Sequence, residues 1–154
     1  KITLAQEFKH TEAYLTMQKI RYGQKLNYTL ELEEAARDLP MLKILIQPLV
    51  ENAINHGLKP KDNGGTIGVS ARLVDDTLQI QVTDDGVGMD EGTLQTLRQA
   101  LQNQQMEGHY GLQNVLRRCR IEYGEKAQLN IESAPRQGTC ITLILPIDKK
   151  EESV

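Results

Sequence analysis

Apolar and polar positions along the chain follow two different periods. Two segments, 3–21 and 41–54, carry apolar residues three and four positions apart, which is the spacing of one face of a helix. The second set is unbroken and consists of Leu42, Leu45, Ile46, Leu49, Val50, Ala53 and Ile54. Other segments alternate apolar and polar residues, as strands with one buried face do. These segments are 27–33, 66–74, 77–84, 127–133 and 139–147.

Capping residues predict where the first two helices begin and end. Residues 3–6 have the form of a capping box, so the first helix is expected to begin there and to reach about Arg21. Asp38 is expected to cap the second helix, with Pro40 in its first turn. Gly57 is expected to end that helix as its C-cap.

The second half of the chain predicts two more helices, at 90–103 and from about Gly111. Helices that alternate with this many strands favour an α+β fold, a two-layer sandwich with the helices on one face of a mostly antiparallel mixed sheet. We divide the chain into an N-terminal helical segment (1–24), one domain (25–148) and a charged tail (149–154).

Composition narrows the class of protein. The 154 residues are 39% hydrophobic and 25% charged, which is ordinary for a globular domain with its own core. A net charge of −3 gives no electrostatic reason to expect nucleic acid or an anionic membrane as a partner. No apolar run approaches the roughly 20 residues that span a bilayer. Because the chain starts at Lys1 without a methionine, we interpret it as a piece of a longer protein.

The second predicted helix carries a polar face beside its apolar one. Asn52, Asn55 and His56 stand at i, i+3 and i+4, where exposed helix positions more often carry Lys or Glu. Amide oxygens can bind Mg²⁺, which takes its other ligands from water and phosphates, and Glu51 could strengthen such a site. A solvated polar face explains the same residues equally well.

The stretch TDDGVGM, residues 83–89, follows a predicted strand with one apolar face. Asp84 has the parity of that face, which is made by Leu78, Ile80 and Val82. Its carboxylate should therefore point inward, where it needs a hydrogen-bond donor such as the exocyclic amine of adenine. Gly86 and Gly88 would let the backbone pass close to a base or sugar, whereas Asp85 should be a solvated turn residue. An ordinary Asp-Gly surface turn has the same sequence.

Two further glycine-bearing stretches follow. Gly108 and Gly111 flank a predicted helix start, where free N–H groups favour a phosphate, although glycines before a helix are also typical of a plain loop. Gly138 and Thr139 precede the last strand and could form no more than a hairpin turn. The order of these four stretches favours a nucleotide site. A helix with a polar face comes first, an Asp at a strand end with Gly-x-Gly comes second, a glycine-rich helix start comes third, and Gly-Thr comes last.

This order resembles the GHKL or Bergerat ATP-binding fold, which sensor histidine kinases, type II topoisomerases, Hsp90 and mismatch-repair ATPases share. IQPLVENAINHG (46–57) looks like the N box of the LytS/YesM class of sensor histidine kinases. TDDGVGM looks like the G1 box of that class, GHYGLQNVLRRC like its G2 region and QGTCITLILP like its final strand. The stretch from Glu7 to Leu26 also resembles the segment that precedes the catalytic domain there.

The resemblance implies ATP and Mg²⁺ as cofactors and assigns a role to each candidate residue. Asn52 would bind Mg²⁺, with Asn55 and His56 near the phosphates. Asp84 would accept a hydrogen bond from the adenine amine. The remaining roles fall to residues that shape the base pocket (Gly86, Gly88), the ATP lid and its hinge (Gly108, Gly111, Leu112) and the adenine end (Thr139).

The resemblance also implies a kinase. Hydrolytic relatives carry a glutamate four residues before the Mg²⁺ asparagine, and Pro48 stands there in this chain and cannot take a proton. His10 lacks the sequence context of a phosphoacceptor, so the acceptor histidine is expected upstream. The expected partners are therefore an upstream dimerisation and histidine phosphotransfer region and a response regulator, in the cytoplasmic part of a bacterial membrane-bound receptor.

Two alternatives remain open at this stage. A stand-alone serine kinase of the anti-sigma-factor type has a similar fold and about this length. A degenerate ATP fold could instead serve as a non-catalytic binding module, although Asn52, Asp84, Gly86 and Gly88 are all present.

Overall fold

The structure is a computed structural model that describes residues 1–102 and 110–147. In the first part of the chain the elements are β1 (Ile2–Thr3), α1 (Leu4–Tyr22), η1 (Gly23–Lys25), β2 (Leu26–Leu32), η2 (Glu34–Ala36), β3 (Pro40–Met41), α2 (Ile46–Asn52) and the π-helical η3 (Ala53–Leu58). They are followed by β4 (Gly65–Val74), β5 (Thr77–Asp84), α3 (Glu91–Gln102), α4 (Tyr110–Tyr123), β6 (Gln128–Ala134) and β7 (Gly138–Pro146). None of the helices in these described ranges is long and apolar enough to cross a bilayer.

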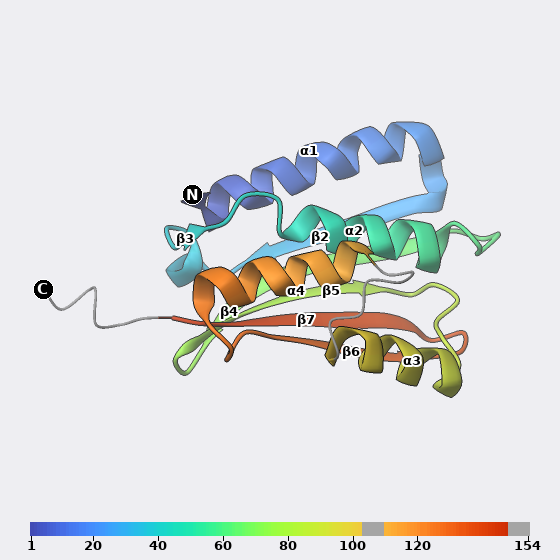
Figure 1. Ribbon diagram of the computed structural model, residues 1–154. Helices are drawn as coiled ribbons and strands as arrows, with labels where there is room; N and C mark the ends of the chain where they lie inside the picture. Colours follow the sequence, from blue (N-terminus) through green and yellow to red (C-terminus); the bar gives the residue numbers. More distant parts are fainter. Residues whose placement is uncertain (103–109, 148–154) are drawn as a thin grey trace, which may run out of the picture.

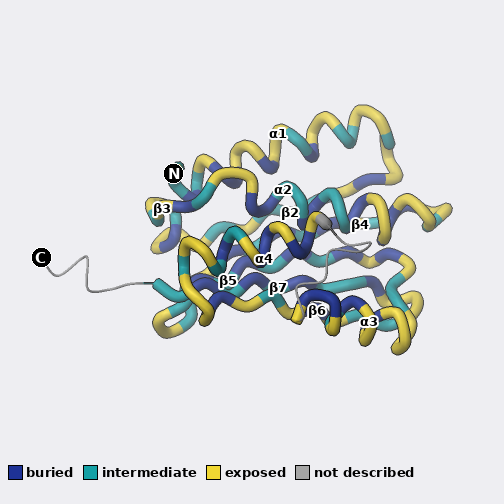
Figure 2. Tube along the Cα trace, viewed as in Figure 1, coloured by how far each residue is buried: buried dark blue, intermediate teal, exposed yellow. Residues whose placement is uncertain are grey.

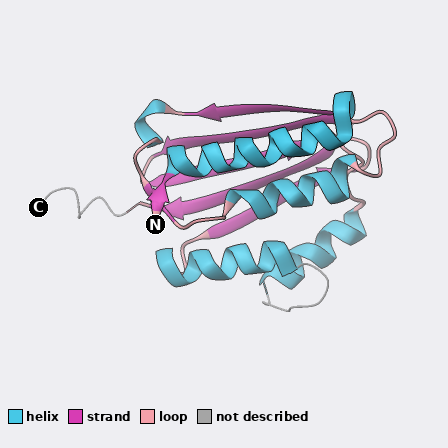
Figure 3. Cartoon of the chain, turned by 90° about the horizontal axis from the view of Figure 1, so that it is seen from above, coloured by secondary structure: helices cyan, strands magenta, loops and turns pink. Residues whose placement is uncertain are grey.

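Five strands form one mixed sheet in the order β2-β4-β5-β7-β6. The β2–β4 pair is parallel and the other three pairs are antiparallel. The helices lie over one face of this sheet, where α1 packs on α2, α2 on α4 and α4 on α3 (Figures 1 and 3). The predicted α+β two-layer sandwich is confirmed.

The core lies between the helix layer and the sheet (Figure 2). Strand β5 follows the predicted alternation to its last residue, so Asp84 is buried together with Leu78, Ile80 and Val82. Helix α1 contributes Leu4, Phe8 and Leu15 to the same core. The predicted capping box is present, because Thr3 and Gln6 exchange backbone-to-side-chain hydrogen bonds of 3.0 and 3.1 Å.

The second helix begins seven residues later than the sequence predicts, because its N-cap is Leu45 and not Asp38. Asp38 caps no helix, and Pro40–Met41 pairs with β1 as a short strand. Helix α2 starts only at Ile46, where the first amide groups donate to the side chain of Glu7 in α1. The predicted C-cap is also wrong, because Gly57 lies inside η3 and Lys59 follows as the cap residue. Both errors come from contacts with residues far away in the sequence.

Candidate functional site

Asp84 is the buried carboxylate at the end of β5, with 8% of its surface exposed. Its Oδ1 accepts a hydrogen bond of 2.9 Å from the backbone N–H of Gly86. Burial raises the pKa of Asp84 above its ordinary value and Asp85 adds to this, whereas the N–H groups of Gly86 and Thr139 and the charge of Lys61 lower it. The predicted inward direction of Asp84 is confirmed.

Gly57 in η3 lies directly over this carboxylate. A Cβ at position 57 would stand 2.5–2.9 Å from the carboxyl atoms of Asp84, a distance that no side chain tolerates. Gly86 is equally constrained, because a Cβ there would overlap the carbonyl of Gly57. That carbonyl accepts a hydrogen bond of 3.1 Å from Val87. The end of the helix and the loop after β5 are therefore in backbone contact, and only glycines permit it.

The β6–β7 hairpin closes the other side of Asp84. Gly138 has a φ of 85°, and a Cβ there would overlap the backbone oxygen of Asp84. The hydroxyl of Ser133 lies 2.9 Å from three partners: it accepts from the N–H of Met89, donates to the carbonyl of Gly138 and contacts the hydroxyl of Thr139. The G1-like loop is thus tied both to the helix and to the hairpin.

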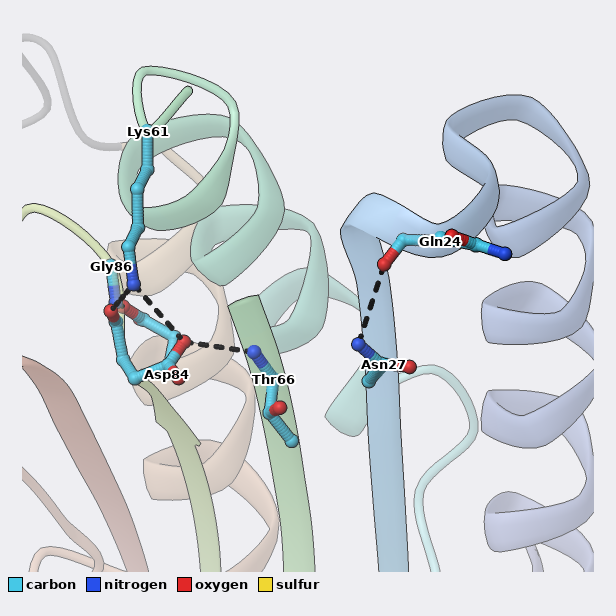
Figure 4. A network of polar contacts seen from close by, with 7 residues as sticks. Gln24, Asn27, Lys61, Thr66, Asp84 and Gly86 are labelled. Atoms are coloured by element: carbon cyan, nitrogen blue, oxygen red, sulfur yellow. Dashed lines mark hydrogen bonds and ion pairs between the residues drawn. The ribbon is translucent and has the colours of Figure 1, made fainter. Parts of the chain in front are cut away.

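Asp85 is exposed and holds two neighbouring segments, whose residues Lys61 and Thr66 lie beside the end of β5 (Figure 4). Its Oδ1 accepts a hydrogen bond of 2.8 Å from the N–H of Thr66, and its carbonyl accepts one of the same length from Lys61 Nζ. Lys61 also forms an ion pair of 4.0 Å with the Asp85 carboxylate. Asp85 is exposed, as its strand parity predicts, but these bonds give it a structural role that parity does not show.

The polar face of the central helix is at the same end of the molecule. Asn52 is half-buried at the end of α2, and Asn55 and His56 are exposed on η3, which packs against β5. Within the described ranges, no group of three His, Cys, Asp or Glu side chains could hold a metal ion. A hard cation at this face would therefore depend on amide oxygens and on a ligand's own phosphates.

The predicted lid residues are described only in part. Gly108 lies outside the described residues. Gly111 is exposed in the first turn of α4, with nothing within 4 Å of the position of a Cβ. Leu112 is buried in the core, and Thr139 is half-buried opposite Asp84 in the β5–β7 pairing. The structure thus brings Thr139 to Asp84, and among the residues that it describes no contact requires glycine at 111.

The sequence analysis did not predict the roles of two residues of the site, Gly57 and Ser133. Gly57 was assigned to a helix cap, although a buried glycine inside an apolar helical stripe is a usable signal for close packing. Ser133 carries no local signal, because its three partners come from β7 and from the loop after β5.

Residues 37–149 match the family described as histidine kinase-, DNA gyrase B-, and HSP90-like ATPase. The chain belongs to this family. Over 149 residues it is 34% identical to the sensor protein kinase HptS of Staphylococcus aureus, in matches that cover 96% of this chain and 28% of that protein. The chain therefore spans little more than a quarter of the length of these curated relatives.

Solved structures show the same fold. The catalytic domain of histidine kinase ThkA superposes with a TM-score of 0.67 at 11% identity, covering 94% of this chain and 93% of that one. The histidine kinase domain of the Erythrobacter litoralis EL346 blue-light activated histidine kinase gives a TM-score of 0.64 at 19% identity, covering 91% and 62%. At these identities the likeness concerns the fold alone.

Proposed function

We propose that the chain is the ATP-binding catalytic domain of a sensor histidine kinase of the LytS/YesM class. It would bind Mg²⁺-ATP and transfer the γ-phosphoryl group to a histidine upstream of Lys1. The observation that carries the proposal is Asp84, a buried carboxylate held by backbone donors, with a glycine where a side chain would cover it.

The residues around Asp84 fit an adenine. An inward carboxylate is costly unless it accepts hydrogen bonds. The exocyclic amine of adenine supplies a donor to Asp84, which forms no ion pair with the residues that the structure describes. Gly57 packs closely over the carboxyl group, where any side chain would displace it. Gly86, Gly88 and Thr139 would border the base, since they belong to the segments that pack around Asp84.

The polar helix face fits a phosphate-bound cation. Asn52 would supply the protein oxygen for Mg²⁺, with Asn55 and His56 toward the phosphates, because one helix carries them to the end of β5. When bound, Mg²⁺ would neutralise part of the negative charge of the phosphates. Gly111 and Leu112 would hinge the ATP lid, with Gly108 at the approach to the same helix.

The residues around the site favour a kinase over a hydrolase. Pro48, in the first turn of α2, can accept no proton from water, so the γ-phosphoryl group is kept for a protein acceptor. His10 is exposed on α1 and is not proposed as that acceptor. The acceptor would lie in an upstream dimerisation region of a membrane-bound receptor, with this domain in the cytoplasm and a response regulator as the next recipient.

A phosphotransfer assay tests the proposal. The 154-residue chain is incubated with Mg²⁺ and ATP labelled at the γ-phosphate, together with the histidine-bearing upstream segment of a class member or with a serine-bearing anti-sigma antagonist. We expect acid-labile label on the histidine segment and none with Asp84→Asn. Label on serine would favour the anti-sigma-type kinase, and label on neither despite ATP binding would contradict a catalytic role.

A further inference from the structure

Glu7 is a buried carboxylate outside the nucleotide site. It projects from α1 with 2% of its surface exposed. Its Oε1 accepts from the N–H of Ile44 at 3.1 Å, and its Oε2 accepts from Leu45 at 2.7 Å and Ile46 at 3.2 Å. In the described part of the chain it forms no ion pair. Its partners are therefore the free amide groups at the start of α2, which the helix dipole makes favourable for a negative charge.

The same short segment is held from the opposite side by α4. The guanidinium of Arg118 donates to the carbonyl of Ile44 at 2.8 Å and also to the carbonyl of Lys43. Ile44 itself has a φ of 60°, which a β-branched residue adopts only under constraint, and its side chain is 53% exposed. Burial of its side chain does not explain this conformation, whereas the hydrogen bond that its N–H donates to Glu7 and the one that its carbonyl accepts from Arg118 do.

The position of this segment fixes the helix that carries the nucleotide residues. Helix α2 continues without interruption into η3, because Asn52 and Ala53 both have right-handed helical dihedral angles. Asn52 is six residues from the first residue of α2, and Gly57 at the far end is in contact with Asp84. A shift or rotation at the start of the helix would therefore move the proposed Mg²⁺ ligand and the residue over the adenine site together.

We propose that Glu7 is a positioning residue for the nucleotide site, with Arg118 as its counterpart on α4. Together they hold the 43–46 segment in a strained turn and so set the position of α2 and η3 against Asp84. Movement of α1 is thereby linked to nucleotide affinity. The inference rests on the proposed function, since it concerns ATP binding at that site.

A purely stabilising cap makes a different prediction. If Glu7 only stabilised the fold, its replacement would lower the unfolding temperature but leave the ATP affinity of the folded protein unchanged. If Glu7 positions the site, affinity falls even where every molecule is folded, and the backbone amide signals of Gly57 and Gly86 shift in NMR spectra.

The test compares Glu7→Gln with Glu12→Gln, the same change at an exposed position of the same helix. ATP affinity is measured by calorimetry at a temperature where both variants are fully folded. We expect Glu7→Gln to lower ATP affinity about fivefold or more and to shift the backbone amide NMR signals of Gly57 and Gly86. Glu12→Gln should behave like the native chain in both measurements. Adding Ile44→Gly should restore most of the loss, because glycine adopts the left-handed turn without strain.

Each remaining outcome has a defined meaning. A folded Glu7→Gln that binds ATP like the native chain overturns the inference and leaves the proposed function standing. If Glu7→Gln does not fold, Arg118→Gln is measured against Arg72→Gln, an exposed arginine of β4, with the same two readings. If the native chain and Glu12→Gln bind no ATP, the proposed function fails, and the inference fails with it.

Discussion

The continuous helix formed by α2 and η3 has a buried carboxylate at each end, and the two are held in opposite ways. At the N-terminal end Glu7 meets three backbone N–H groups, where the helix dipole favours a negative charge. At the C-terminal end Asp84 lies against Gly57, where carbonyl groups predominate. The pKa of Asp84 is raised chiefly by burial, and two backbone N–H groups offset this only in part.

The difference separates a carboxylate whose partners all lie within the fold, Glu7, from one that we propose to bind a ligand, Asp84. Glu7 uses both oxygens within the fold, so its replacement should mainly cost stability and the position of the helix. Asp84 carries a charge that the fold stabilises poorly, so its replacement should cost the fold little and the ligand much. A pKa that burial shifts at a single residue is typical of functional sites.

The largest expected effect is that of Asp84→Asn on ATP binding. The change removes a charged acceptor from the adenine amine, and hydrogen bonds to charged groups contribute on the order of 10- to 100-fold in affinity. The free energy of unfolding should stay equal or rise, because a buried charge is lost. Calorimetric titration measures the ATP affinity, and denaturant unfolding measures the free energy of unfolding. A large loss of stability with unchanged ATP affinity would show that Asp84 is the structural carboxylate.

Glu7→Ala should show the opposite pattern in stability. It leaves three amide groups at the start of α2 without their acceptor, and we expect the free energy of unfolding to fall by about 3 kcal/mol. Glu12→Ala, at an exposed position of α1, should change it by less than about 0.5 kcal/mol. Equal effects of the two changes in urea unfolding would show that the Glu7 cap contributes nothing specific.

Gly57→Ala sharpens the comparison at the C-terminal end of the helix. Its methyl group would meet the Asp84 carboxylate at 2.5–2.9 Å and displace it, so ATP affinity should fall about tenfold. Gly92→Ala is the matched helical control, because the nearest atom to its Cβ position is 3.6 Å away. Unchanged affinity of Gly57→Ala would place the ligand away from Asp84.

The smallest expected effect is on the pH dependence of stability. Because the pKa of Asp84 is raised above 3.8, the folded state binds the proton more tightly than the unfolded chain. The contribution of this group to stability is fully present below about pH 3.8 and is lost as pH rises through the raised value. The free energy of unfolding of the native chain, relative to Asp84→Asn, should therefore decline across that window. A pH-independent difference would mean that Asp84 is not buried in this way.

The elements and residue directions that depend on local pattern could be predicted from the sequence. Strand parity alone placed Asp84 in the core, and the capping box fixed the start of α1. The start of α2 could not be predicted, because its cap comes from Glu7, which lies 39 positions before Ile46. The contact of Gly57 with Gly86 and the three hydrogen bonds of Ser133 likewise depend on tertiary packing. The glycine at 57 is a local sign of close packing but does not name its partner, and Ser133 carries no local signal.

The most direct measurement is a paired titration of the 154-residue chain with ATP and with inosine triphosphate in the presence of Mg²⁺. The two nucleotides differ at the exocyclic position that Asp84 is proposed to bind, where inosine carries an oxygen in place of the amine. We expect the native chain to bind ATP at least about tenfold more tightly and Asp84→Asn to lose this preference. Equal affinity of the native chain for both nucleotides would contradict Asp84 as the residue that recognises adenine.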